Sequence, residues 1–257
     1  MALQIRNPHS VLAALEKRPQ DVLKVSVPAS LTEREQRGGA AADAMVGRDA
    51  WLKVLQMARA KGIPVASAAG ARVSRDEAGR STGGAEAQLR EATGVTAEVL
   101  FRNALDRAEG KGLWLALDSL TDPQNVGAIF RTASFFGVQG ILMTQERSAP
   151  LTAAVYDVAC GGVEDVPFTL QTNLQRAFEI AKDAGLWILG TSEHAQQNLS
   201  TIERDRPWLL VLGNEEKGMR RLTAESCDVT CQIPPQGWVT SLNVSSTAAV
   251  MISRLSG

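Results

Sequence analysis

From Gly112 onward, short and continuously apolar segments alternate with longer segments that have helical spacing. The apolar segments are "LWLALDSL", "GILMT", "VPFTL", "LWILGT", "WLLVLG" and "VTCQIP". Strands without alternating polar residues are typical of a parallel sheet that helices cover on both faces. Residues 112–257 are therefore predicted to form an α/β domain. Ligands of such a sheet bind in the loops after the carboxyl ends of its strands.

Two helix-then-strand patterns precede this region, in "NPHSVLAALEKRPQDVLKVSVP" and in "DAWLKVLQMARAKGIPVASA". They predict a small α/β domain over residues 1–70. Residues 71–111 are rich in Gly, Ala and charged side chains, which is typical of a linker. The sequence thus indicates two domains joined by a long connection.

The composition is that of an ordinary globular protein, because 44% of the 257 residues are hydrophobic and 21% are charged. Its apolar runs are shorter than the roughly 20 residues that a transmembrane helix needs. The N-terminus lacks the order of features found in a secretory signal, so we expect a cytoplasmic protein without membrane contact and leave an organellar presequence open. Residues 1–112 carry 17 basic and 13 acidic side chains, which permits a polyanionic partner but equally fits a solvated surface.

Several functional classes lack their signatures. The three cysteines are too few for a disulfide framework, and no histidine stands near the C-x3-C pair Cys227 and Cys231 to complete a metal site. We expect buried thiols there. The glycine-rich loops of dinucleotide-binding and P-loop proteins are absent, and so is the G-x-S-x-G turn of hydrolases.

The first unusual loop leads into the segment "DPQNVGAIFRTASFFG", which has the spacing of an amphipathic helix. Asn125 is predicted to cap its N-terminus. Arg131 projects opposite the apolar arc. It is either a solvated surface residue or, together with the helix N-terminus, part of an anion site suited to phosphate.

Two further loops follow strands. In "LGNEEKGMRRL", Gly213 and Gly218 flank a polar stretch, and they either form a turn or allow a ligand to approach the backbone closely. In "IPPQGWVTSLNVSSTAAVMI", Ser241 and Asn243 stand at the entry of the last predicted helix. One cap needs only one residue, so one of the two is left over.

Taken in order, these three loops resemble the signature motifs of the SpoU/TrmH branch of the SPOUT methyltransferases, which methylate ribose 2′-hydroxyls of RNA. The N-terminal segments and "ATGVTAEV" are similar to the L30-like RNA-binding domain and linker of the subgroup that acts on ribosomal RNA, including the large-subunit guanosine 2′-O-methyltransferases. The resemblance implies a trefoil knot in the C-terminal domain, a homodimer, S-adenosylmethionine as methyl donor and no metal.

The resemblance also implies roles for individual residues. Seven positions would bind the donor or shape its pocket: Thr191, Leu212, Gly213, Asn214, Gly218, Ile233 and Leu242. Five would serve catalysis or RNA placement: Asn125, Arg131, Glu215, Ser241 and Asn243. Arg131 is expected to act electrostatically, because a guanidinium resists deprotonation. Transfer RNA, a ribosomal adenosine whose methylation gives antibiotic resistance, and a role as a non-catalytic RNA-binding or ribosome-assembly factor remain alternatives.

Overall fold

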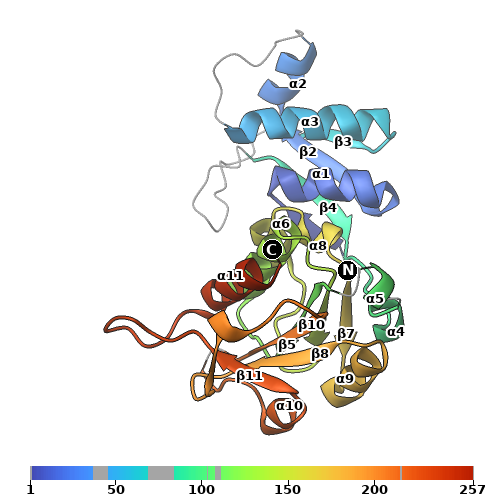
Figure 1. The fold of residues 1–257 in the computed structure, drawn as a ribbon. Helices are drawn as coiled ribbons and strands as arrows, with labels where there is room; N and C mark the ends of the chain where they lie inside the picture. The colour runs from blue at the N-terminus through green and yellow to red at the C-terminus, as the bar shows by residue number, and fades with distance from the viewer. Residues whose placement is uncertain are drawn as a thin grey trace. The chain divides into compact units, whose positions relative to one another are not determined.

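The structure is a computed structural model of the whole chain, and it describes residues 2–36, 46–68, 84–102, 104–107, 111–214 and 216–256. Contacts divide the chain into two compact units (Figure 1). One unit contains Met1–Ala92 and Leu151–Asp165, and the other contains Thr93–Pro150 and Val166–Gly257. The boundaries 1–70, 71–111 and 112–257 stay a prediction. None of the helices in the described residues is long and apolar enough to cross a membrane.

The first unit is built on a four-stranded sheet of order β1-β4-β2-β3, in which β4 is antiparallel to both β1 and β2 and β3 is parallel to β2. Its elements are β1 (Ala2–Ile5), α1 (Pro8–Lys17), η1 (Pro19–Asp21), β2 (Val22–Pro28), α2 (Ala29–Gln36), α3 (Val46–Ala60), β3 (Val65–Ala68), β4 (Glu86–Arg90), α7 (Ala153–Ala159) and α8 (Gly162–Asp165). Asn7 caps α1 by accepting a hydrogen bond from the His9 amide, and Pro8 takes the first helical position.

The second unit contains a seven-stranded sheet of order β7-β6-β5-β10-β8-β11-β9, in which every neighbouring pair is parallel. Its elements are α4 (Ala97–Leu100), α5 (Ala104–Arg107), β5 (Leu113–Asp118), α6 (Pro123–Phe135), β6 (Gly140–Thr144), β7 (Phe168–Gln171), α9 (Leu174–Asp183), β8 (Trp187–Thr191), β9 (Gln197–Asn198), η2 (Leu199–Thr201), β10 (Trp208–Gly213), α10 (Arg221–Glu225), β11 (Val229–Gln232) and α11 (Val244–Leu255). The predicted α/β domain with a parallel sheet is confirmed.

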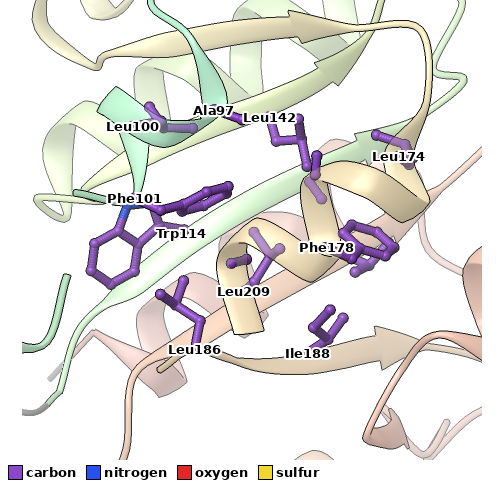
Figure 2. Packing of buried hydrophobic residues seen from close by; sticks show 14 of the residues in the cluster. Ala97, Leu100, Phe101, Trp114, Leu142, Leu174, Phe178, Leu186, Ile188 and Leu209 are labelled. Carbon is purple, nitrogen blue, oxygen red and sulfur yellow. The ribbon is translucent and has the colours of Figure 1, made fainter. Parts of the chain in front are cut away.

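The central strands are buried on both faces, as their continuous hydrophobicity predicts. On one face, Trp114 of β5 and Leu209 of β10 pack with α4, α5 and α9, and Figure 2 shows Phe178 of α9 in this cluster. The other face belongs to α6 and α11, which pack against each other. Burial on both faces fixes the strands, so the loops at their carboxyl ends start from defined positions.

Candidate active site

The parallel register brings the carboxyl ends of four strands to one end of the large sheet, which we call the sheet edge. Asp118, the last residue of β5, pairs with Gly213, the last residue of β10. Thr191, the last residue of β8, pairs with Cys231 of β11, one residue before that strand ends. Three loops that were singled out in the sequence begin at this edge, after β5, β10 and β11. The structure therefore confirms that they share one end of one sheet.

The loop after β10 closes on itself. Asn214 and Gly218 exchange both backbone hydrogen bonds, at 3.0 and 2.9 Å between N and O. A Cβ on Gly213 would lie 2.3 Å from the backbone C of Gly218 and 2.3 Å from the backbone N of Met219, so only glycine fits. Gly218 has φ +66°, in the left-handed region that favours glycine. Both glycines are thus required by the turn itself.

Asn214 ties this loop to β5. Its Nδ2 donates to the Ser119 carbonyl oxygen at 2.9 Å, and its Oδ1 accepts from the amides of Glu216 and Lys217 at 3.1 and 3.2 Å. Ser119 itself has φ +63° and donates its amide to Thr144 Oγ1 at the end of β6. The carboxyl ends of three strands are therefore joined by hydrogen bonds. Glu215, a predicted site residue, lies outside the described residues.

An ion pair between a buried carboxylate and a partly exposed arginine, which the sequence did not reveal, fixes the far end of the same loop. Asp118 is fully buried, and its carboxylate accepts from Arg220 Nε at 2.6 Å and from the Arg220 amide at 3.0 Å. Its Oδ1 also accepts from Ser119 Oγ at 3.1 Å. The Arg220 side chain is 42% exposed, so its guanidinium faces both the carboxylate and solvent. The loop is held at both ends by groups from β5.

The remaining donor-site candidates take different positions. Thr191 is half-buried and donates its Oγ1 to the Val211 carbonyl oxygen at 3.0 Å. The Leu212 side chain is fully buried in the core, so only its backbone is available to a ligand. Ile233 is half-buried, and Leu242 is 53% exposed. Residues 233–242 form no backbone–backbone hydrogen bond with any described residue, which leaves their polar groups available to a ligand.

The structure corrects one prediction for α6. The N-cap is Asp122, whose side chain accepts from the Gln124 amide at 2.9 Å, and not Asn125. Pro123 explains the difference, because proline is favoured at the first helical position and has no amide to be capped. Asn125 is instead a helical residue that is 6% exposed. Asn125 therefore lies on the buried side of α6.

The catalytic candidates on α6 and around the start of α11 differ in burial and in their hydrogen bonds. Arg131 is exposed on α6, and its guanidinium makes no hydrogen bond or ion pair with any described residue. Asn125 lies six residues earlier on the buried face, about 9 Å along the helix axis. Asn243 caps α11 by accepting from the Ser245 amide at 2.8 Å, whereas Ser241 is exposed and has no side-chain hydrogen bond to a described residue. Ser241 is therefore the residue left over from capping.

The cysteines near this edge are expected to be unreactive. Cys231 is fully buried and Cys227 is half-buried, and burial raises the pKa of each thiol to about 12. Such thiols stay protonated near neutral pH and are poor nucleophiles and ligands. In the part of the chain that the structure describes, no group of three or more His, Cys, Asp or Glu side chains is placed to hold a metal ion.

Known proteins resemble this chain in sequence and in fold. The model of the SpoU rRNA methylase family matches residues 112–253. The 23S rRNA (guanosine-2′-O-)-methyltransferase RlmB of Pseudomonas aeruginosa is 44% identical over 158 residues, which are 62% of this chain and 64% of that protein's length. RlmB of Bordetella pertussis is 33% identical over 244 residues, which are 95% of this chain and 92% of that protein.

A solved structure has the same fold. The SpoU methyltransferase AviRb from Streptomyces viridochromogenes, in complex with the cofactor AdoMet, superimposes with a TM-score of 0.72 at 19% identity. The superposition covers 100% of this chain and 89% of that one. The match therefore includes both units of the present chain.

Proposed function

Because the chain belongs to the SpoU rRNA methylase family, we propose that it transfers a methyl group from S-adenosylmethionine to the ribose 2′-hydroxyl of a guanosine in 23S ribosomal RNA. The observation that carries this proposal is the similarity to RlmB of B. pertussis over almost the whole of both chains. The substrate would be met in the cytoplasm, where ribosomes are assembled.

The residues at the sheet edge suit S-adenosylmethionine, whose adenosine and amino acid parts need polar groups and whose sulfonium needs no metal. Backbone groups of residues 233–242 form no backbone–backbone hydrogen bond with any described residue, and Leu242 offers an exposed apolar surface. We assign the donor to the loops that contain Thr191, Leu212, Gly213, Asn214, Gly218, Ile233 and Leu242. When bound there, the donor supplies an electrophilic methyl group, and the chain has to align and activate the hydroxyl.

Arg131 has the chemistry required for that activation. A ribose hydroxyl is a weak nucleophile near neutral pH, and negative charge develops on its oxygen as the proton leaves. A guanidinium that makes no hydrogen bond or ion pair with the described residues can bind the neighbouring phosphate through two parallel hydrogen bonds and stabilise that charge. Asn125, Glu215, Ser241 and Asn243 would orient the arginine, the RNA and the donor.

A homodimer would complete this site. The exposed large apolar side chains include Phe135 of α6, which is 82% exposed, Trp238 of the loop before α11, which is 99% exposed, and Val250 of α11, which is 44% exposed. All three belong to α6, α11 and the loop leading to α11, the elements that also carry Arg131 and Ser241. A second copy would cover this surface and bring its own residues to the site. The trefoil knot of the C-terminal domain is part of the same proposal.

The test is methyl transfer under single-turnover conditions, with labelled S-adenosylmethionine and 23S rRNA that lacks the modification. We expect Arg131→Ala to lower the rate about 100- to 1000-fold, as the loss of one charge-stabilising group does. Arg176→Ala is the matched control, because Arg176 is an exposed arginine on α9. Full activity of Arg131→Ala would rule out the catalytic assignment.

Two further outcomes would replace the proposal itself. Methylation of transfer RNA but not of 23S rRNA would assign a different substrate. If calorimetry detected no binding of S-adenosylmethionine to the wild-type protein, the chain would be an RNA-binding or assembly factor and not an enzyme.

A further inference from the structure

The first unit contains an open cavity of about 460 Å³ that the proposed methyl-transfer site does not use. It lies between the β1 and β4 strands and helix α7. The lining residues are Ala2, Leu3, Gln4, Arg6, Gln88, Ala153, Ala154 and Asp157. Small-molecule and cofactor sites usually occupy 300–1000 Å³, so the cavity can hold one ligand of nucleotide size.

The pleat of the sheet places polar side chains at this cavity. In β2 and β4, Val25, Ala87 and Leu89 point into the core, so the residues between them point to the opposite face. The strand register puts Gln4 directly opposite Gln88, and Gln88 directly opposite Lys24. Side chains paired in this way have Cβ atoms about 5 Å apart. A row of two amides and one ammonium therefore crosses three adjacent strands.

These groups are available to a ligand. With the described residues, the side chains of Gln4, Gln88, Arg6 and Lys24 form no hydrogen bond and no ion pair. Each amide carries donors and acceptors, and each cation carries donors only. The alanines of α7 supply a flat apolar wall opposite them. The cavity thus combines an apolar wall, two groups that can read hydrogen-bonding edges and the positive charge of Arg6, and Lys24 stands next to Gln88 on the same face of the sheet.

The wall of the cavity is held firmly to the sheet. Asp157 Oδ1 accepts from the amides of Arg6 and Asn7, each at 2.8 Å, and Asn7 Nδ2 donates to the Asp157 carbonyl oxygen at 2.7 Å. Ser10 Oγ donates to the Tyr156 carbonyl oxygen at 2.6 Å. The two bonds to the Asp157 carboxylate are charge-assisted and strong, so the cavity is formed before any ligand arrives. A preformed site loses less conformational entropy on binding.

We propose that this cavity binds one unstacked nucleotide of the substrate RNA, with the base against Gln4 and Gln88 and the phosphate beside Lys24. Sequence-specific RNA recognition mostly uses bases that have left a helix and are hydrogen-bonded at their edges. The Asp157 carboxylate at the α7 side repels phosphate, which places the phosphate towards Lys24. The proposal rests on the proposed function, because it takes RNA as the substrate.

The test measures binding of the full-length protein to a 23S rRNA transcript by fluorescence anisotropy at several salt concentrations. The double variant Gln4→Ala, Gln88→Ala should raise the RNA dissociation constant about tenfold, as the loss of base-edge contacts does, and leave the salt dependence unchanged. Lys24→Gln should weaken binding and lower the slope of log K against log salt by about one unit. The rate at saturating RNA and the affinity for S-adenosylmethionine should not change in either variant.

Matched controls come from α3, which packs on the other face of the sheet. Gln56 and Lys53 are exposed there, so Gln56→Ala and Lys53→Gln should bind RNA like the wild type. Wild-type RNA affinity in the double variant would overturn this site while methyl transfer by the wild type continued to support the proposed function. RNA binding that depends on Gln4 and Gln88, in a protein that transfers no methyl group, would support the site and refute the enzyme.

Discussion

Replacement of Gly213 by alanine should damage the donor site more than any other single methyl group added to these loops. The new Cβ would lie 2.3 Å from two backbone atoms, the C of Gly218 and the N of Met219. Carbon atoms in contact are normally about 3.5 Å apart, so the backbone at Gly218 and Met219 must move away by roughly 1.2 Å. That shift breaks the pair of hydrogen bonds between Asn214 and Gly218.

The expected cost combines strain and lost hydrogen bonds. Overpacking costs about 1–3 kcal/mol, and each of the two lost hydrogen bonds about 1 kcal/mol, so we expect roughly 4 kcal/mol. In a chain of this size that is a fall of roughly 8–16 °C in the unfolding midpoint. Urea unfolding would measure the free energy, and calorimetry would measure the affinity for S-adenosylmethionine, which should fall at least about tenfold because the loop is displaced.

Two other glycines serve as internal controls. A Cβ on Gly237 would meet no atom within 4 Å, so Gly237→Ala should leave stability unchanged. A Cβ on Gly218 would meet no atom within 4 Å either, but the alanine in Gly218→Ala has to adopt φ +66°, which costs about 1–2 kcal/mol. If Gly213→Ala were as stable as Gly237→Ala and bound the donor equally well, the close approach of the two backbone segments would be refuted.

Three more perturbations follow from the structure. Asp118→Asn removes the charge that holds the half-exposed Arg220, so urea unfolding should show a loss of about 1–2 kcal/mol in the free energy of unfolding. An unchanged unfolding midpoint would show that the ion pair does not stabilise the fold. Glu164→Gln leaves the buried Arg18 guanidinium without its carboxylate and should lower the free energy of unfolding by about 3 kcal/mol in the same assay. An unchanged free energy would show that solvent replaces the carboxylate. Burial raises the pKa of Cys231 to about 12, so its thiol stays protonated as the pH rises. Iodoacetamide should therefore alkylate Cys231 slowly at pH 8 until the protein unfolds. Fast labelling of the folded protein would contradict this.

Hydrophobic pattern predicted the large sheet well, because continuous apolar strands such as Trp208–Gly213 fit only a sheet that is buried on both faces. It also placed the three loops at one edge, since parallel strands end on the same side. It failed at the start of α6, where Asn125 and Asp122 are both good capping residues. The position of Pro123 at the first helical turn decided between them.

Contacts between residues far apart in the sequence could not be predicted. Asp118 and Arg220 are 102 residues apart, and the only local signal was an acid at the end of an apolar strand. The cavity of the first unit needs Gln4, Gln88 and α7 together, and no periodicity links these three segments. Fold class therefore follows from local pattern, whereas the cavity of the first unit follows only from tertiary contacts.

Mapping the product tests most directly whether the protein methylates one ribose in 23S ribosomal RNA. Unmodified 23S rRNA would be incubated with the full-length protein and S-adenosylmethionine, digested to nucleosides, and examined by mass spectrometry and by primer extension at low nucleotide concentration. We expect 2′-O-methylguanosine at a single position, and we expect it to be lost in Arg131→Ala. Methylation of a base, or no methyl group in the RNA at all, would contradict it.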